Sequence, residues 1–218
     1  MPTKDRRAGS SLDYDEEVTF GTLNGTCWRS IKRHVVEDTT VRVWLVQEHH
    51  LSKQEEVDEA SAWLRKRGMK SMWSKATAGV GKGTIGGVAI FADEALGLAP
   101  PSNGEAELEP GRLLCGMVEC SGFRPMLCMS AYFVVGQGLG YQNMELLQKI
   151  GACACSEPAY FVVGGDFNAG PSQLEHSGFL ERAGATVFKS RAATCFTKSS
   201  SSEIDFFIGS SELSHTLK

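Results

Sequence analysis

The segment Tyr160–Asn168 constrains the fold of this chain more than any other stretch. It reads Tyr-Phe-Val-Val-Gly-Gly-Asp-Phe-Asn, an apolar run that stops at two glycines and continues into a carboxylate and a carboxamide. Such a run predicts a strand buried on both faces of an α/β fold, in which ligands bind beyond the carboxyl ends of the strands. Because side chains alternate along a strand, Asp166 and Asn168 are expected to share one face. The segment predicts a site that binds a metal or activates water beside a phosphate; the alternative is an Asx-rich turn capped by Asp166.

Strands and helices alternate along the rest of the chain, and its 218 residues fit one domain. Further strands are expected at 18–23, 41–47, 69–74, 86–91, 186–189, 194–197 and 203–208, with a hairpin at 112–120 and 126–134. Helices are expected near 143–155 and 178–183, and 97–111 is expected to be a mobile loop.

One further helix is predicted by its start signal. Ser52-x-x-Glu55 is a capping-box pattern, and Val57, Ala60 and Leu64 recur on one face of the helix that follows. Gly68 is the expected stop of this helix.

Composition indicates a soluble intracellular protein, nuclear or cytoplasmic. The seven cysteines are odd in number and form no C-x-x-C pair, which is typical of a reducing compartment. No apolar run approaches the roughly 20 residues of a membrane span, and the N-terminus lacks a signal-peptide core. Residues 1–17 are polar and aperiodic, so we expect a flexible leader before a domain spanning 18–218.

The motif Gly81-Lys82-Gly83-Thr84-Ile85-Gly86 matches G-x-G-x-x-G, which suggests dinucleotide binding. That function needs a helix N-terminus after the glycines, whereas Gly87–Phe91 is strand-like. A hairpin loop without a nucleotide cofactor is therefore the favoured interpretation.

Two more carboxylates lie in or just after predicted strands. Glu48 follows the apolar strand that ends at Gln47, and oxygen ligands of this kind suit Mg²⁺. His49 and His50 are adjacent and form no zinc-binding pattern. Asp205 lies inside an apolar strand, where an unpaired ion is costly, so a partner is expected for it.

Asn24 and Tyr132 complete an ordered pattern of strand-associated motifs: Asn24, Gln47-Glu48, Gly86-Gly87-Val88-Ala89-Ile90-Phe91, Tyr132, Gly165-Asp166-Phe167-Asn168 and Ser202-x-Ile204-Asp205-Phe206-Phe207. In this pattern the chain resembles the endonuclease/exonuclease/phosphatase superfamily of Mg²⁺-dependent phosphoesterases, from about 18 to 208. After Asn168, the residues Gln173, Gly178-Phe179-Leu180 and Ala183-Gly184 also resemble the stretch that follows G-D-F-N in endonuclease modules of non-LTR retrotransposons.

The resemblance implies a four-layered α/β sandwich, in which two mixed or mostly antiparallel sheets pack face to face with helices outside. It implies that Glu48 binds Mg²⁺ (or Mn²⁺) with support from Asn24, and that Asp166 orients or deprotonates the attacking water. It also implies that Asn168 and Tyr132 hold the phosphate, while Asp205 fixes a histidine.

The chain departs from the resembled pattern at its C-terminal end. The superfamily carries a Ser-Asp-His block on a later strand, whereas this sequence ends 13 residues after Asp205. His215 has no preceding aspartate and is a poor substitute. We therefore expect a missing last strand and weak phosphodiester cleavage by this chain.

The resemblance leaves three functions open for this chain. The first is a metal-dependent endonuclease that acts on DNA, although the net charge of −4 argues against a broad nucleic-acid-binding surface. The second is a phosphatase or phosphodiesterase for a small phosphoester, such as an inositol phosphate or a phospholipid headgroup. The third is a degenerate, non-catalytic fragment of the same fold.

Overall fold

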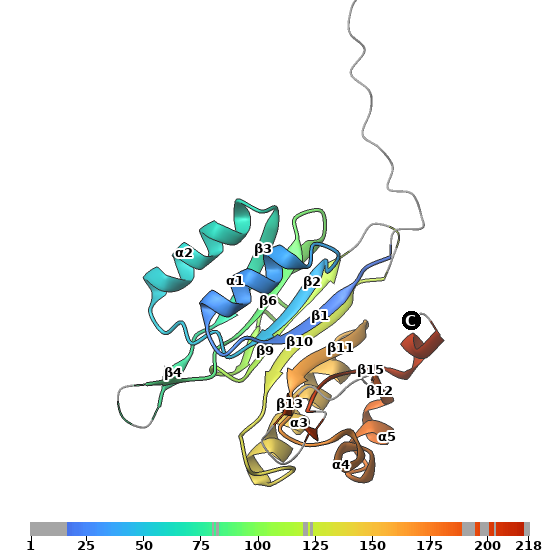
Figure 1. Cartoon of the computed structure of the whole chain (residues 1–218). Coiled ribbons are helices and arrows are strands. Elements are labelled where there is room, and N and C mark those ends of the chain that lie inside the picture. The colour runs from blue at the N-terminus through green and yellow to red at the C-terminus, as the bar shows by residue number, and fades with distance from the viewer. Residues whose placement is uncertain are drawn as a thin grey trace, which may run out of the picture.

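The structure is a computed structural model that describes residues 17–79, 81, 83–119, 122, 124–188, 195–196, 201–202 and 204–215. It contains two main β-sheets with helices on both outer sides (Figure 1). The expected leader lies outside the described residues, apart from residue 17. No described helix combines the length and apolarity needed to cross a membrane.

The first sheet has four strands in the order β1 (Phe20–Asn24), β2 (Val43–Gln47), β6 (Val88–Asp93) and β3 (Met69–Ser74). β1 and β2 are parallel, and the other pairs are antiparallel. All five residues of β2 are buried, as expected for a strand with the apolar run Val43–Val46, and the buried set includes Gln47 at its end. Because β1 and β2 are parallel, Asn24 and the residue after Gln47 lie at the same edge of the sheet.

The second sheet follows the order β12, β15, β11, β10, β9 and β7, and β8 pairs with β9. The bounds are β12 (Ala185–Phe188), β15 (Asp205–Ser210), β11 (Tyr160–Asp166), β10 (Met126–Tyr132), β9 (Leu113–Glu119), β7 (Gly97–Ala99) and β8 (Glu107–Glu109). β10 and β11 are parallel, and the other pairs are antiparallel. β15 is therefore paired on both sides.

Helices form the two outer layers of the domain. α1 (Trp28–Glu37) and α2 (Gln54–Arg65) lie on the first sheet, and α3 (Tyr141–Ser156), α4 (Pro171–His176) and α5 (Phe179–Ala183) lie on the second (Figure 1). Separate apolar clusters fill the two helix–sheet layers and the space between the sheets. This is the expected four-layered sandwich.

The remaining described elements are short. They are β4 (Thr77–Ala78), β5 (Thr84–Ile85), β13 (Cys195–Phe196), β14 (Ser201–Ser202) and the 3₁₀ helix η1 (Ser211–His215). β4 and β5 form a hairpin, and the last glycine of the G-x-G-x-x-G motif leads into β6. A strand thus follows these glycines, as the sequence predicts.

The two main sheets approach each other closely at Gly164, which has no side chain. A Cβ atom on Gly164 of β11 would lie 2.8 Å from Leu45 Cδ1 of the opposite sheet and 2.8 Å from Phe207 Cε1. The glycine in the apolar run therefore serves inter-sheet packing, and it brings the ends of β2 and β11 together.

Two local expectations are wrong, and two helices were not expected. α2 begins at Gln54, and Glu56 rather than Glu55 closes its start, accepting hydrogen bonds from the backbone N–H groups of Ser52 and Lys53. The sequence also predicted neither α1 nor α4.

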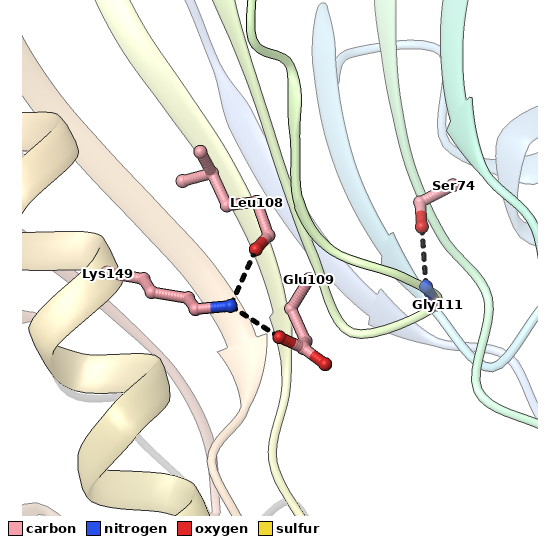
Figure 2. Close-up of polar contacts among 5 residues, drawn as sticks. All are labelled: Ser74, Leu108, Glu109, Gly111 and Lys149. Atoms are coloured by element: carbon pink, nitrogen blue, oxygen red, sulfur yellow. Dashed lines mark hydrogen bonds and ion pairs between the residues drawn. The ribbon is translucent and has the colours of Figure 1, made fainter.

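The second wrong expectation is the mobile loop at 97–111, because this segment contains two paired strands, β7 and β8. Lys149 Nζ of α3 donates to Leu108 O at 2.9 Å and contacts Glu109 Oε2 at 2.5 Å, and Gly111 N donates to Ser74 Oγ at 2.6 Å (Figure 2). The segment is held from two sides.

Candidate active site

Asp166 ends β11, and its carboxylate is held by two donors. Asn24 Nδ2, at the end of β1, donates to Oδ2 at 2.8 Å, and the backbone N of Asn168 donates to Oδ1 at 3.0 Å. Only 4% of Asp166 is exposed. Asn24 and Asp166 come from opposite sheets, so the hydrogen bond between them joins the two sheets at the carboxyl ends of β1 and β11.

Tyr132, Asp166 and Asp205 lie side by side on three neighbouring strands. Tyr132 pairs with Asp166 between β10 and β11, and Asp166 pairs with Asp205 between β11 and β15. Burial, the largest cause, and the nearby negative charges of Asp205 and Glu48 together raise the pKa of Asp166 to about 7, against the opposing effect of its hydrogen bonds. The site therefore gathers three carboxylates.

Glu48 follows β2 directly and contacts the opposite sheet through Tyr132. The Tyr132 hydroxyl hydrogen-bonds the Glu48 carboxylate, and burial together with this contact raises the pKa of the tyrosine well above its usual value. The phenol therefore stays protonated and donates to Glu48.

Asn168 is not on a strand, so the expectation that it continues the alternation of Asp166 is wrong. β11 ends at Asp166, and Asn168 adopts a left-handed conformation with φ 45°. Its backbone donates to Asp166 Oδ1, which is the Asx turn of the alternative interpretation, and its Nδ2 donates to Phe133 O at 3.0 Å. Asn168 nevertheless contacts Asp166.

The donor set at this edge fits a hard divalent cation. Asn24 Oδ1 is buried and has no hydrogen-bond partner among the described residues, although its Nδ2 is used. In the part of the chain that the structure describes, no three His, Cys, Asp or Glu side chains are arranged so that they could hold a metal ion without other ligands. One carboxylate and one amide oxygen, with water and phosphate oxygens, are a typical Mg²⁺ environment.

All six residues predicted for the site lie at this edge: Asn24, Glu48, Tyr132, Asp166, Asn168 and Asp205. Their individual roles stay predictions. η1 contains His215, and its side chain lies outside the described residues.

Sequence reasoning assigned no role to two further residues around the site. Gln47 is fully buried, and its Nε2 donates across the sheet interface to Ser130 Oγ at 3.0 Å. The Arg112 guanidinium lies 5.2 Å from the centroid of the Tyr132 ring, and its Nη1 donates to Tyr132 O at 3.3 Å. An amide ending a fully apolar strand is a signal for Gln47, since buried amides need partners.

No protein-family profile and no curated protein sequence matches this chain. Its structure is similar to the AP endonuclease LMAP from Leishmania major, with a TM-score of 0.64 and 16% sequence identity over 98% of this chain and 85% of that chain. A humanized TDP2 from D. rerio gives a TM-score of 0.64 and 14% identity over 89% and 83%.

A third similar structure is the endonuclease domain of TRAS1, a telomere-specific non-LTR retrotransposon. It gives a TM-score of 0.59 and 15% identity over 90% of this chain and 85% of that chain. At such identities the likeness is one of fold: this chain has the fold of the endonuclease/exonuclease/phosphatase proteins.

Proposed function

We propose that this protein is a divalent-metal-dependent phosphodiesterase that cleaves DNA by attack of water on a backbone phosphate. The observation that carries this proposal is the contact between Asn24 and Asp166. It places a buried amide oxygen without a partner among the described residues beside a carboxylate of raised pKa.

Glu48 and Asn24 Oδ1 would hold a Mg²⁺ or Mn²⁺ ion, which when bound neutralises charge on phosphate oxygens. Tyr132 orients the Glu48 carboxylate through its hydroxyl. The three carboxylates otherwise repel one another, and a cation at this edge would offset that repulsion.

Asp166 is the proposed base that accepts a proton from water. A general base works best with a pKa near the working pH, and the pKa of Asp166 is raised to about 7. Asn24 and the backbone of Asn168 hold its two oxygens in place. Asn168 Nδ2 carries a second hydrogen besides the one given to Phe133 O, and this hydrogen is proposed to contact the phosphate.

The choice of DNA as substrate rests on the likeness to structures described as endonucleases and to a structure of another protein that holds a DNA product. One similar structure is a 3′ phosphatase from Neisseria bound to a product DNA hairpin, at a TM-score of 0.61 and 16% identity over 93% of this chain and 90% of that chain. Arg112 beside Tyr132 supplies a positive charge at the same edge.

The test is nicking of supercoiled plasmid by excess protein with Mg²⁺ or Mn²⁺ during long incubations. We expect Asp166→Ala and Glu48→Gln to lower the rate about 10²-fold or more. Glu59→Gln, which changes an exposed carboxylate on α2, should nick like wild type.

Nicking that survives Asp166→Ala would contradict the assigned base. Release of phosphate from an inositol phosphate without plasmid nicking would favour the small-phosphoester alternative. Metal binding without either reaction would favour a non-catalytic module.

A further inference from the structure

We propose that His49 is a positioning residue that holds the backbone at Glu48 so that the carboxylate can bind a divalent cation. This inference rests on the proposed function, because it assigns the metal to Glu48. It concerns a residue for which the sequence indicated no role.

The His49 ring is fully buried, and both of its nitrogens are engaged. The backbone N–H of Leu51 donates to Nδ1 at 3.0 Å, so Nδ1 carries no hydrogen. The hydrogen therefore lies on Nε2, which donates to Ser74 O at 3.1 Å. The ring thus ties the residues after Glu48 to the end of β3.

The His49 ring is packed closely between Trp73 and Gly87. The ring of Trp73 makes an edge contact with it at a centroid distance of 5.1 Å. A Cβ atom on Gly87 would lie 2.5 Å from His49 Cε1, so glycine is required opposite the ring. Gly87, the residue before β6, thus lies directly against the His49 ring.

The backbone that carries Glu48 needs such a support. Glu48 and His50 both have left-handed conformations, with φ 56° and φ 59°. A non-glycine residue is strained in this region and persists only where surrounding contacts hold it. The backbone N–H groups of His49 and His50 donate to Gly87 O at 3.3 Å and Gly86 O at 3.2 Å, and the His49 ring adds two further bonds.

Ser74 extends the same support to the partner of Glu48. Its carbonyl accepts from His49, and its Oγ accepts from the backbone of Gly111 at 2.6 Å (Figure 2). The next residue, Arg112, accepts a hydrogen bond from the Tyr132 backbone at 2.8 Å. One strand end therefore fixes both sides of the Glu48–Tyr132 contact.

The test is calorimetric titration of the metal-free protein with Mn²⁺ at pH 7.5. Its variants separate the two ring bonds: His49→Phe keeps a ring and loses both, His49→Asn places an acceptor near Leu51 N, and His49→Gln places a donor near Ser74 O. Val43→Ala is the matched control, since it removes buried volume from β2, the strand that leads into Glu48, at the end of β2 far from Glu48.

We expect His49→Phe to weaken Mn²⁺ binding about 10-fold or more, as is typical when the support of a metal ligand is removed. His49→Asn and His49→Gln should fall between wild type and His49→Phe, and they carry the test if His49→Phe fails to fold. Val43→Ala should lose stability and bind Mn²⁺ within about twofold of wild type.

Folded His49 variants that bind Mn²⁺ like wild type would overturn the inference, as would equal weakening in Val43→Ala. A separate titration of Glu48→Gln tests the proposed function: Mn²⁺ binding as strong as in wild type would remove the metal from Glu48. Loss of binding in Glu48→Gln with no effect at His49 leaves the proposed function and refutes the positioning role.

Discussion

Replacing Asp166 by asparagine should stabilise the metal-free protein at alkaline pH while it removes the proposed base. The folded protein holds this carboxylate with a pKa of about 7, compared with an ordinary value of 3.8. A raised pKa of an acid means that its charged form is disfavoured in the folded state. The resulting loss of stability is absent below pH 3.8, grows as the pH rises, and is complete above pH 7.

The difference between these pKa values corresponds to about 4 kcal/mol at pH 8. Asparagine has one acceptor oxygen, so either Asn24 Nδ2 or the Asn168 backbone loses its acceptor, at a cost of about 1–3 kcal/mol. The net expectation for Asp166→Asn is a gain of about 1–3 kcal/mol in the free energy of unfolding at pH 8 in EDTA. At pH 4 the penalty has fallen to about 0.6 kcal/mol, so the lost acceptor outweighs it and the variant should be less stable than wild type.

Urea unfolding followed by tryptophan fluorescence measures this change at both pH values. Mn²⁺ should then stabilise wild type more than Asp166→Asn, because a cation relieves the repulsion among the three carboxylates. A variant no more stable than wild type at pH 8, or a gain that is the same at pH 4 and pH 8, would refute the reasoning.

Two further predictions concern stability. Burial lowers the pKa of His49 from 6.5 to about 4, so its contribution to stability is complete above pH 6.5 and falls by about 3 kcal/mol as the pH drops to about 4. Unfolding curves of Asp166→Asn should show this loss of stability, and the double variant Asp166→Asn/His49→Gln should lack it. The same pH dependence in both proteins would contradict the lowered pKa of His49. Gly164→Ala should lower the free energy of unfolding by about 1–3 kcal/mol, because its Cβ would lie 2.8 Å from Leu45 Cδ1. The control Gly83→Ala, whose Cβ meets no atom within 4 Å, should change the free energy of unfolding by less than about 0.5 kcal/mol. Equal effects of the two substitutions in thermal unfolding would disprove the packing argument.

Local sequence patterns determined most of the strands and the two longest helices that the structure describes, α2 and α3. The apolar runs that end at Gln47 and Asp166 became β2 and β11, and Val57, Ala60 and Leu64 form the buried face of α2. These patterns work because side chains two residues apart on a strand, or three and four apart on a helix, share a face. The polar residues after such runs were therefore found at one edge of the fold.

The tertiary structure decided the features that depend on distant neighbours. α1 buries Ile31 and Val35 against the first sheet, but the residue before it, Cys27, makes no side-chain cap, so the sequence carries no start signal for this helix. The segment 97–111 is ordered because β9 pairs with its two strands. Pairing partners of this kind are not visible in a local pattern.

The chemistry of the site was decided in the same way. Asp166 is the last residue of β11, two positions before Asn168. Its pKa is raised by burial and by the negative charges of Asp205 on β15 and of Glu48 after β2. His49 has its role because Ser74, Trp73 and Gly87 surround it. Residue types at strand ends follow from local sequence, whereas burial, charge proximity and backbone strain arise only when residues far apart in the chain pack together.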